Sequence, residues 1–325
     1  MKKAVLPALV MLAACALALL AGNSAVSAGR TLQVLLGGGS ATERLIVLQV
    51  RLPRVLAAAA AGAGLSVSGF LLQGSLDNTL ASPGILGINH GAGLFVLLAA
   101  LLFPYQAAAR GLMAFAGALL VTGLVVSLSA VSGLSRTSVI LSGVAVSALC
   151  TAVSDVIISL KPETVADRAA FQLGGFASLT ASSVSLAAPV ILAGILLAAV
   201  FAPAMDLMAL GDETAGGLGL PVRAVRGGFI LCAALLAAAA VSMCGMIGFV
   251  GLLVPNTLRL IRHGRSRGSL LLCAAYGAAF LVLCDTLARL AAFPYELPCG
   301  LILSLTGAPF LIMTLLRRRK RLGLQ

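Results

Sequence analysis

Long runs of apolar residues, separated by short polar or Gly- and Pro-containing breaks, repeat along the whole chain. A helix needs about 20 apolar residues to cross a bilayer, and runs of this length exceed the strands of a membrane barrel. Within lipid, a helix satisfies its own backbone hydrogen bonds. The pattern therefore predicts an all-α polytopic membrane protein with about ten transmembrane helices, at residues 4–22, 53–73, 84–102, 111–129, 138–159, 184–202, 227–244, 247–261, 269–289 and 298–316.

Two connections between the predicted spans are longer than the others, at about 160–183 and about 203–226. Neither is long enough to fold alone, so we expect a single transmembrane domain over residues 1–325. The two halves on either side of the 203–226 connection have opposite orientations, which permits an inverted repeat. No internal sequence identity supports such a repeat. The boundary beside Gly245 is the least defined.

Composition and charge agree with this topology. The 325 residues are 60% hydrophobic and only 10% charged, whereas about a quarter of the residues in soluble domains are charged. Most of the 22 Lys and Arg residues fall in loops on the same side as both termini, Arg317–Arg321 included. The positive-inside rule then predicts cytoplasmic termini. The net charge of +12 is a topology signal, because no soluble basic domain for nucleic acid exists here.

Catalytic and metal-binding patterns are missing from the sequence. No Walker A pattern and no His-Glu-x-x-His pattern occurs, and the only histidines are His90 and His263. The seven cysteines lie in or beside apolar spans without a Cys-x-x-Cys pair, which is typical of small buried hydrophobes. We therefore expect no enzymatic site, no metal and no cofactor in this chain.

The second predicted span opens with an unusual basic motif, Arg51-Leu-Pro53-Arg54. Pro53 suits the first turn of a helix, and Arg51 and Arg54 are three residues apart, so they share a face. Cations at a helix N-terminus oppose its dipole at a cost of about 0.3–1 kcal/mol each. Two explanations remain open, which are anchoring at lipid headgroups and contact with a partner outside the membrane.

This motif is the first of an ordered series of polar, Gly- and Pro-containing segments. The segments are Arg51–Arg54, Asp77–Pro83, Gly87–Gly93, Ala209–Thr214, Gly219–Pro221, Gly248–Pro255, Asp285–Arg289, Glu296–Gly300 and Gly307–Phe310. Together they resemble the FecCD-like family, the permeases of ATP-driven importers for iron–siderophore complexes, haem and vitamin B12. The resemblance covers nearly the whole chain from residue 51. Thr79 and Asn256 depart from the family pattern, which usually has proline and histidine there.

The resemblance implies a type II ABC importer permease fold in the bacterial inner membrane, and it implies the partners. They are a second permease copy, two ATP-hydrolysing cassette subunits and an extracytoplasmic substrate-binding protein, with lipid around the spans. It also implies that the first span is retained. Lys2, Lys3 and the small residues at 24–28 by themselves also fit a cleaved secretory signal.

Site residues follow from the resemblance at both membrane faces. Those that would receive the binding protein are Arg51, Arg54 and Arg289. Asp285 lies one helical turn before Arg289, so we expect a structural ion pair between them. The residues that would couple to the ATPase are Ala209, Leu210, Gly211, Asp212, Glu213 and Gly219. An ordinary surface helix with acids at its N-terminus is the alternative there.

Gly174 and Gly175 lie in the 160–183 connection and would form a gate hinge. By resemblance, the fifth and tenth spans line the pore, with sparse polar candidates at Ser142, Ser147, Thr151, Ser304 and Thr306. Hydrogen bonds from these hydroxyls to their own helix carbonyls are an equally good interpretation.

The combined prediction is a permease subunit that moves an iron chelate, driven by a separate ATPase. A cobalamin permease of the same family is the alternative. An ion-coupled secondary transporter would need ionisable residues at mid-depth, which this chain almost lacks. A membrane scaffold fits the composition and leaves the ordered motifs unexplained.

Overall fold

The computed structural model describes residues 2–21, 26–104, 106–177, 179–261, 264–292 and 295–321. Every regular element within these ranges is helical. The elements are α1 (Lys2–Leu20), α2 (Ala28–Leu35), α3 (Ala41–Arg44), the π-helix η1 (Leu45–Arg51), α4 (Leu52–Ser75), the 3₁₀-helix η2 (Pro83–Leu86), α5 (Ile88–Leu102), α6 (Ala107–Val131), α7 (Arg136–Leu160), the 3₁₀-helix η3 (Pro162–Thr164), α8 (Val165–Leu173), α9 (Ala181–Met208), α10 (Asp212–Gly217), α11 (Val222–Cys244), α12 (Val250–Ile261), α13 (Ser266–Leu290) and α14 (Cys299–Arg321).

Helix α4 is the centre of the bundle, with α9, α11, α12 and α13 packed against it. Small residues allow this contact. A Cβ on Gly62 would collide with the carbonyl oxygen of Gly277 in α13, and a Cβ on Gly69 would collide with that of Gly251 in α12. Where lipid supplies no hydrophobic driving force between helices, such close backbone contact supplies the packing energy.

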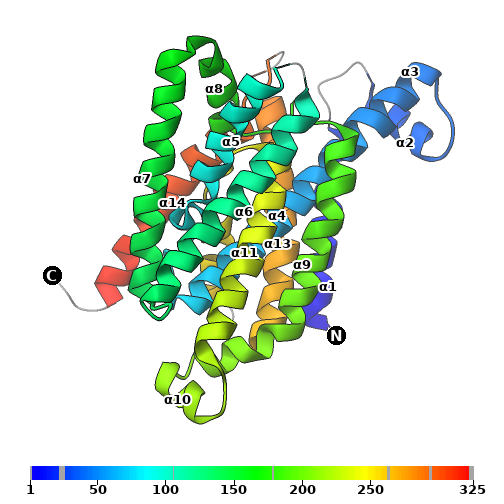
Figure 1. The fold of residues 1–325 in the computed structure, drawn as a ribbon. Helices are drawn as coiled ribbons and strands as arrows, with labels where there is room; N and C mark the ends of the chain where they lie inside the picture. Colours follow the sequence, from blue (N-terminus) through cyan, green and yellow to red (C-terminus); the bar gives the residue numbers. More distant parts are fainter. Residues whose placement is uncertain are drawn as a thin grey trace.

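The bundle has two distinct ends (Figure 1). The N-terminal end of α1, helix α10 and the C-terminal end of α14 lie together at one end, the α10 end. Helices α2, α3 and α8 lie at the other, the α8 end. This arrangement places the 203–226 connection on the side of both chain ends, as the sequence predicts, and the 160–183 connection on the opposite side.

Each of the ten predicted spans contains a helix. Six helices are long and apolar enough to cross a membrane, at Ala41–Ser75, Ala108–Val131, Arg136–Leu160, Ala181–Met208, Val222–Cys244 and Ser266–Leu290. Three shorter apolar helices are Leu6–Leu20, Ile88–Leu102 and Cys299–Met313. The predicted all-helical membrane architecture is therefore confirmed, with helices of unequal length. With 12 residues, α12 measures about 18 Å, which is less than the hydrocarbon thickness of about 30 Å.

The uncertain boundary beside Gly245 is a true interruption between α11 and α12. Gly245 has φ +68°, and Phe249, a residue with a side chain, has φ +66°. The predicted span at 84–102 is also in two pieces, because Gly87 with φ +73° separates η2 from α5. Broken helices are tolerated in a membrane where protein surrounds them or where they line a cavity.

Residues 28–51 are the largest part of the fold that the sequence did not predict. The second span was expected to begin at residue 53, but helical structure runs on upstream through η1 to α3. Ser40 caps α3 in a capping box with Glu43, a signature that was present in the sequence. Figure 1 shows α2 and α3 extending sideways from the bundle.

Candidate functional site

A charged cluster joins α4, α13 and the segment before α14 at the α8 end. Arg54 Nη2 lies 3.0 Å from Asp285 Oδ1, and Arg54 Nη1 lies 2.8 Å from Glu296 Oε2. Arg289 Nε lies 3.2 Å from Asp285 Oδ2. The Asp285 side chain is buried and that of Glu296 is partly exposed. Asp285 thus pairs with both arginines, and Glu296 supplies the second negative charge of the cluster. Glu296 belonged to a motif in the sequence but was not assigned to a site.

Arg51 and Arg289 hold the C-terminal end of α1. Arg51 Nη1 donates to Leu19 O at 3.1 Å, and Arg289 Nη2 donates to Ala18 O at 3.4 Å. Both arginines are buried, with exposed fractions of 4% and 3%. Cations near the last carbonyls of a helix are favoured by its dipole. This placement does not support direct contact of Arg51 or Arg289 with a binding protein. Arg54 keeps a side-chain exposure of 12%.

The predicted hinge pair lies against two other elements. Gly174 has φ +59° and Gly175 N donates to Cys244 O at 2.7 Å, while Gly300 N at the start of α14 donates to Gly174 O at 3.3 Å. The pair is therefore bound to the interruption after α11 and to α14. A Cβ on Gly174 would collide with the carbonyl oxygen of Met246.

A cavity of about 470 Å³ lies beside the hinge pair. Its lining combines charged side chains, including Arg54, Arg110, Asp167 and Glu296, with apolar ones from the hinge segment. Arg110 Nη1 lies 2.9 Å from Asp167 Oδ1, which joins α6 to α8. The cavity thus borders both the charged cluster and the segment expected to move.

The predicted pore-lining residues lie on α7 and α14, which both figures place on the same side of the molecule. Ser142, Ser147 and Thr151 are partly buried, and Ser304 and Thr306 are exposed. Thr151 Oγ1 donates to Ser147 O at 2.9 Å, and Thr306 Oγ1 donates to Ile302 O at 2.8 Å. For these two threonines the structure shows the bond to the helix's own carbonyl.

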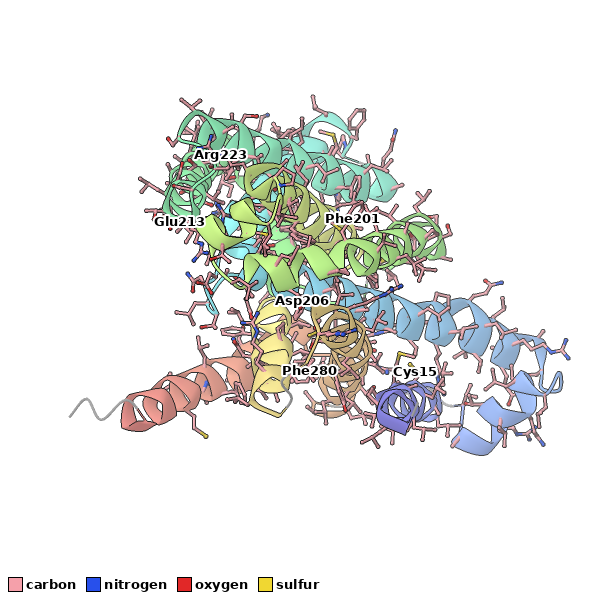
Figure 2. All side chains as sticks on the ribbon, turned by 90° about the horizontal axis from the view of Figure 1, so that it is seen from below. Cys15, Phe201, Asp206, Glu213, Arg223 and Phe280 are labelled. Carbon is pink, nitrogen blue, oxygen red and sulfur yellow. The ribbon has the colours of Figure 1, made fainter. Side chains whose placement is uncertain are left out.

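The predicted coupling segment forms α10 at the α10 end. Figure 2 looks onto this end and shows Glu213 at its rim, on the same side as Arg223, with Asp206 nearer the centre. Ala209, Leu210, Glu213 and Gly219 are exposed, and Gly211 has φ +99°. Within the described ranges, the Glu213 side chain makes no hydrogen bond or ion pair.

Asp212 differs from its neighbour Glu213 because it has two arginine partners. Arg226 Nη2 lies 2.6 Å from Asp212 Oδ2, and Arg136 Nη2 lies 3.2 Å from Asp212 Oδ1. The hydrogen bond from Arg226 lowers the pKa of Asp212. In the sequence both arginines counted only toward topology. Arg226 was placed in the connection before the predicted span at 227–244, whereas α11 begins at Val222 and buries Arg226.

Other reactive side chains are dispersed. The seven cysteines are free thiols, and all except Cys15 are buried. Among the residues that the structure describes, no group of three or more His, Cys, Asp or Glu is placed to hold a metal ion. His263 lies outside the described residues.

These features define a class: a multi-pass membrane permease with a polar cluster and a glycine pair at one end and a short projecting helix at the other. The chain belongs to the FecCD transport family, whose model matches residues 9–317. In this family the permease is the membrane component of an ABC importer, and a separate subunit carries the ATPase.

Individual relatives and a solved structure agree with the family. The chain is 36% identical to an Fe(3+)-citrate import permease of Bacillus subtilis over 90% of this chain and 87% of the relative. It is 35% identical to the vitamin B12 permease BtuC of Citrobacter koseri over 95% and 92%. The structure of a metal-chelate type ABC transporter in an inward-facing conformation matches with a TM-score of 0.85 and 25% identity, covering 97% of this chain and 99% of that one.

Proposed function

We propose that this chain is the permease of an ABC importer that moves a ferric chelate into the cytoplasm, with both chain termini cytoplasmic. A second copy would complete the pore between the α7 and α14 faces, two ATPase subunits would bind at the α10 end, and a substrate-binding protein would bind at the α8 end. Family membership supports these partners, and the separation of the two functional ends supports their placement.

One observation carries the ATPase assignment. Helix α10 projects from the bundle with Leu210 exposed at 58% and Leu218 at 61%, on either side of the acidic Glu213. At the end of the bundle, exposed apolar side chains beside a charge are typical of a protein–protein contact. Gly211 and Gly219, both with positive φ, bound the projection.

For the binding protein, the structure supports a narrower proposal than the sequence did. Arg54 and Glu296 would contact it, because both retain exposure beside the cavity. Arg51 and Arg289 would support this surface from within through the end of α1. A charge pair at the rim of an interface steers association more than it adds affinity.

A ferric chelate is the proposed cargo because iron permeases are prominent among the relatives, one from Bacillus subtilis and one from Escherichia coli being named for ferric citrate. A vitamin B12 permease matches over a larger share of both chains, so cobalamin is the second candidate. Residues 139–154 of α7 and 299–316 of α14 carry sparse hydroxyls and no charged side chain, which suits a bulky ligand that must not adhere.

Uptake by the complete transporter tests the proposal. Proteoliposomes that contain the permease, its ATPase subunit and its binding protein would be supplied with ferric citrate, a ferric hydroxamate, haemin or cobalamin. We expect ATP-dependent accumulation of a ferric chelate. Accumulation of cobalamin alone would show that cobalamin, and not a ferric chelate, is the cargo. Accumulation by the permease without companion subunits would refute an ATP-driven role.

A further inference from the structure

The carboxylate of Asp212 lies between two arginines that belong to different parts of the bundle. Arg226 of α11 donates to both of its oxygens, at 2.7 Å and 2.6 Å. Arg136, at the start of α7, donates to Oδ1 at 3.2 Å. The coupling segment is therefore joined at one point to α7 and α11, while Glu213 faces outward.

Each arginine continues the connection to a turn of the main bundle. Arg226 Nε donates to Ser75 O at the end of α4, and its Nη1 donates to Leu134 O in the turn between α6 and α7. Arg136 Nη1 donates to Asp77 Oδ2, 2.7 Å away, in the turn after α4. Through these bonds Asp212 is linked to two turns at the α10 end, the turn after α4 and the turn between α6 and α7.

Both turns contain unusual backbone conformations. Asp77 has φ +46° and Leu134 has φ +54°. Of the described residues with side chains, only these two and Phe249 have positive φ. Such conformations are retained where the surrounding structure holds them, and they concentrate at switch regions. Here the two arginines that bind Asp212 also stabilise the two turns, because each turn accepts a hydrogen bond from one of their guanidinium groups.

Burial makes the connection stiff on one side. Arg226 is only 3% exposed, and its described bonds go to two carbonyls and to Asp212. The charge of a buried guanidinium that loses its carboxylate is left unpaired, which is costly. When α10 moves, Arg226 must therefore either move with it or lose its ion pair with Asp212. Arg136 is partly exposed and can follow α10 with less resistance.

We propose that Asp212 is a positioning residue that transmits movement of α10 to the turns at Asp77 and Leu134. Glu213 and the exposed leucines bind the ATPase, whereas Asp212 passes the resulting displacement to α4 and α7. This assignment rests on the proposed importer function. It divides the coupling segment into a binding part and a transmitting part, which the family pattern does not do.

The test compares Asp212→Asn with Glu213→Gln in the complete transporter reconstituted in proteoliposomes. ATPase-subunit binding, ATP hydrolysis and substrate accumulated per ATP would be measured separately. For Asp212→Asn we expect normal subunit binding and continued hydrolysis, with transport per ATP reduced roughly 2- to 30-fold, the range for residues in a coupling network. Glu213→Gln should weaken subunit binding and leave transport per ATP unchanged.

A second variant keeps the test valid if Asp212→Asn fails to fold. Arg136→Gln retains the Arg226–Asp212 pair but breaks the link to Asp77, and it should also lower transport per ATP. Asp77→Asn should act non-additively with Arg136→Gln, because they remove the same contact. Asp212→Glu should recover part of the coupling.

Two results would overturn the proposal. One is unchanged transport per ATP in Asp212→Asn and Arg136→Gln, and the other is loss of ATPase-subunit binding in Asp212→Asn to the same degree as in Glu213→Gln. Failure of the proposed function is separate, because there the unmodified transporter itself shows no ATP-dependent accumulation.

Discussion

Arg54 and Asp285 face each other across the contact between α4 and α13, with Arg54 Nη2 3.0 Å from Asp285 Oδ1. Asp285 also binds Arg289, one turn along the same helix. One buried carboxylate thus pairs with two arginines from the two helices that form the largest contact in the bundle, and Glu296, which also binds Arg54, supplies the second negative charge. This arrangement explains how the first arginine of α4 can lie inward without an unpaired charge.

Replacing Asp285 by Asn should therefore destabilise the permease strongly. The substitution preserves shape but leaves Arg54 and Arg289 without their shared carboxylate. Loss of one partner from a buried ion pair costs about 3–5 kcal/mol. Thermal unfolding in detergent would measure the loss of stability in Asp285→Asn. Glu296→Gln is the matched control, because Glu296 is partly exposed and pairs with Arg54 alone among the residues that the structure describes, so its effect should be about 1 kcal/mol or less. Equal effects of the two variants would contradict the central role of Asp285.

Arg51→Met should loosen the N-terminal part of the chain while the rest of the bundle remains folded. Arg51 donates to Leu19 O, Val26 O and Thr31 Oγ1, which hold α2 against the end of α1. Methionine fills the space but satisfies none of these acceptors, at about 1–3 kcal/mol for a buried group left unpaired. Limited proteolysis should show faster cleavage between α1 and α3, with the main thermal transition nearly unchanged. Leu48→Met, an exposed control on η1, should cleave at the normal rate.

Glycine contacts at the centre of the bundle predict a clear contrast between two alanine substitutions. A Cβ at Gly69 would collide with the carbonyl oxygen of Gly251, which belongs to a backbone that cannot move aside cheaply. Gly69→Ala should therefore separate α4 from α12 and cost about 1–3 kcal/mol. Gly123 in α6 has nothing within 4 Å of an added Cβ, so Gly123→Ala should be neutral or stabilising by up to about 1 kcal/mol. Thermal unfolding of the purified Gly69→Ala and Gly123→Ala variants would measure this contrast in stability.

The exposed apolar face of α2 predicts contact with lipid at the α8 end. Leu32 and Leu35 on this helix and Leu36 directly after it are exposed, Leu36 at 81%, while Thr31 and Val34 are buried. Such a helix is typical of the membrane interface. The chain has no tryptophan, so Leu36→Trp provides a single reporter. Its emission should be blue-shifted in liposomes and quenched by brominated lipids. Quenching by aqueous acrylamide alone would place α2 in water.

The sequence predicted the helical architecture well because period and length are local signals. Each predicted span contains a helix, and the doubtful boundary beside Gly245 is a real interruption. It did not predict the short helices outside the apolar runs, as in α2 and α3, or the exact length of α12, which has 12 residues.

Candidate site residues could be proposed from motif positions in the sequence, but their environments could not. Motif position identified Arg51, Arg54 and Arg289 together, yet only tertiary packing decides that Arg51 and Arg289 are buried and hold α1. Asp285 could be paired with Arg289 because both lie on one helix, whereas its contact with Arg54 spans 231 residues of sequence. The partners of Asp212 were missed for the same reason, because Arg136 lies 76 residues away.

The pKa of Asp212 predicts how its link to Arg226 depends on pH. The hydrogen bond from Arg226, with a further contribution from Arg136, lowers this pKa below the ordinary value of 3.8. A lowered pKa in the folded state means that the stabilisation is complete above the unfolded value and is lost as the pH falls through the folded value. The difference in thermal stability between the unmodified permease and Asp212→Asn should therefore be constant from about pH 8 to about pH 5 and shrink only below about pH 4. Thermal unfolding of both proteins across this range measures the difference. A difference that already shrinks between pH 7 and pH 5 would mean that a group with a pKa near neutrality, and not Asp212, controls the link.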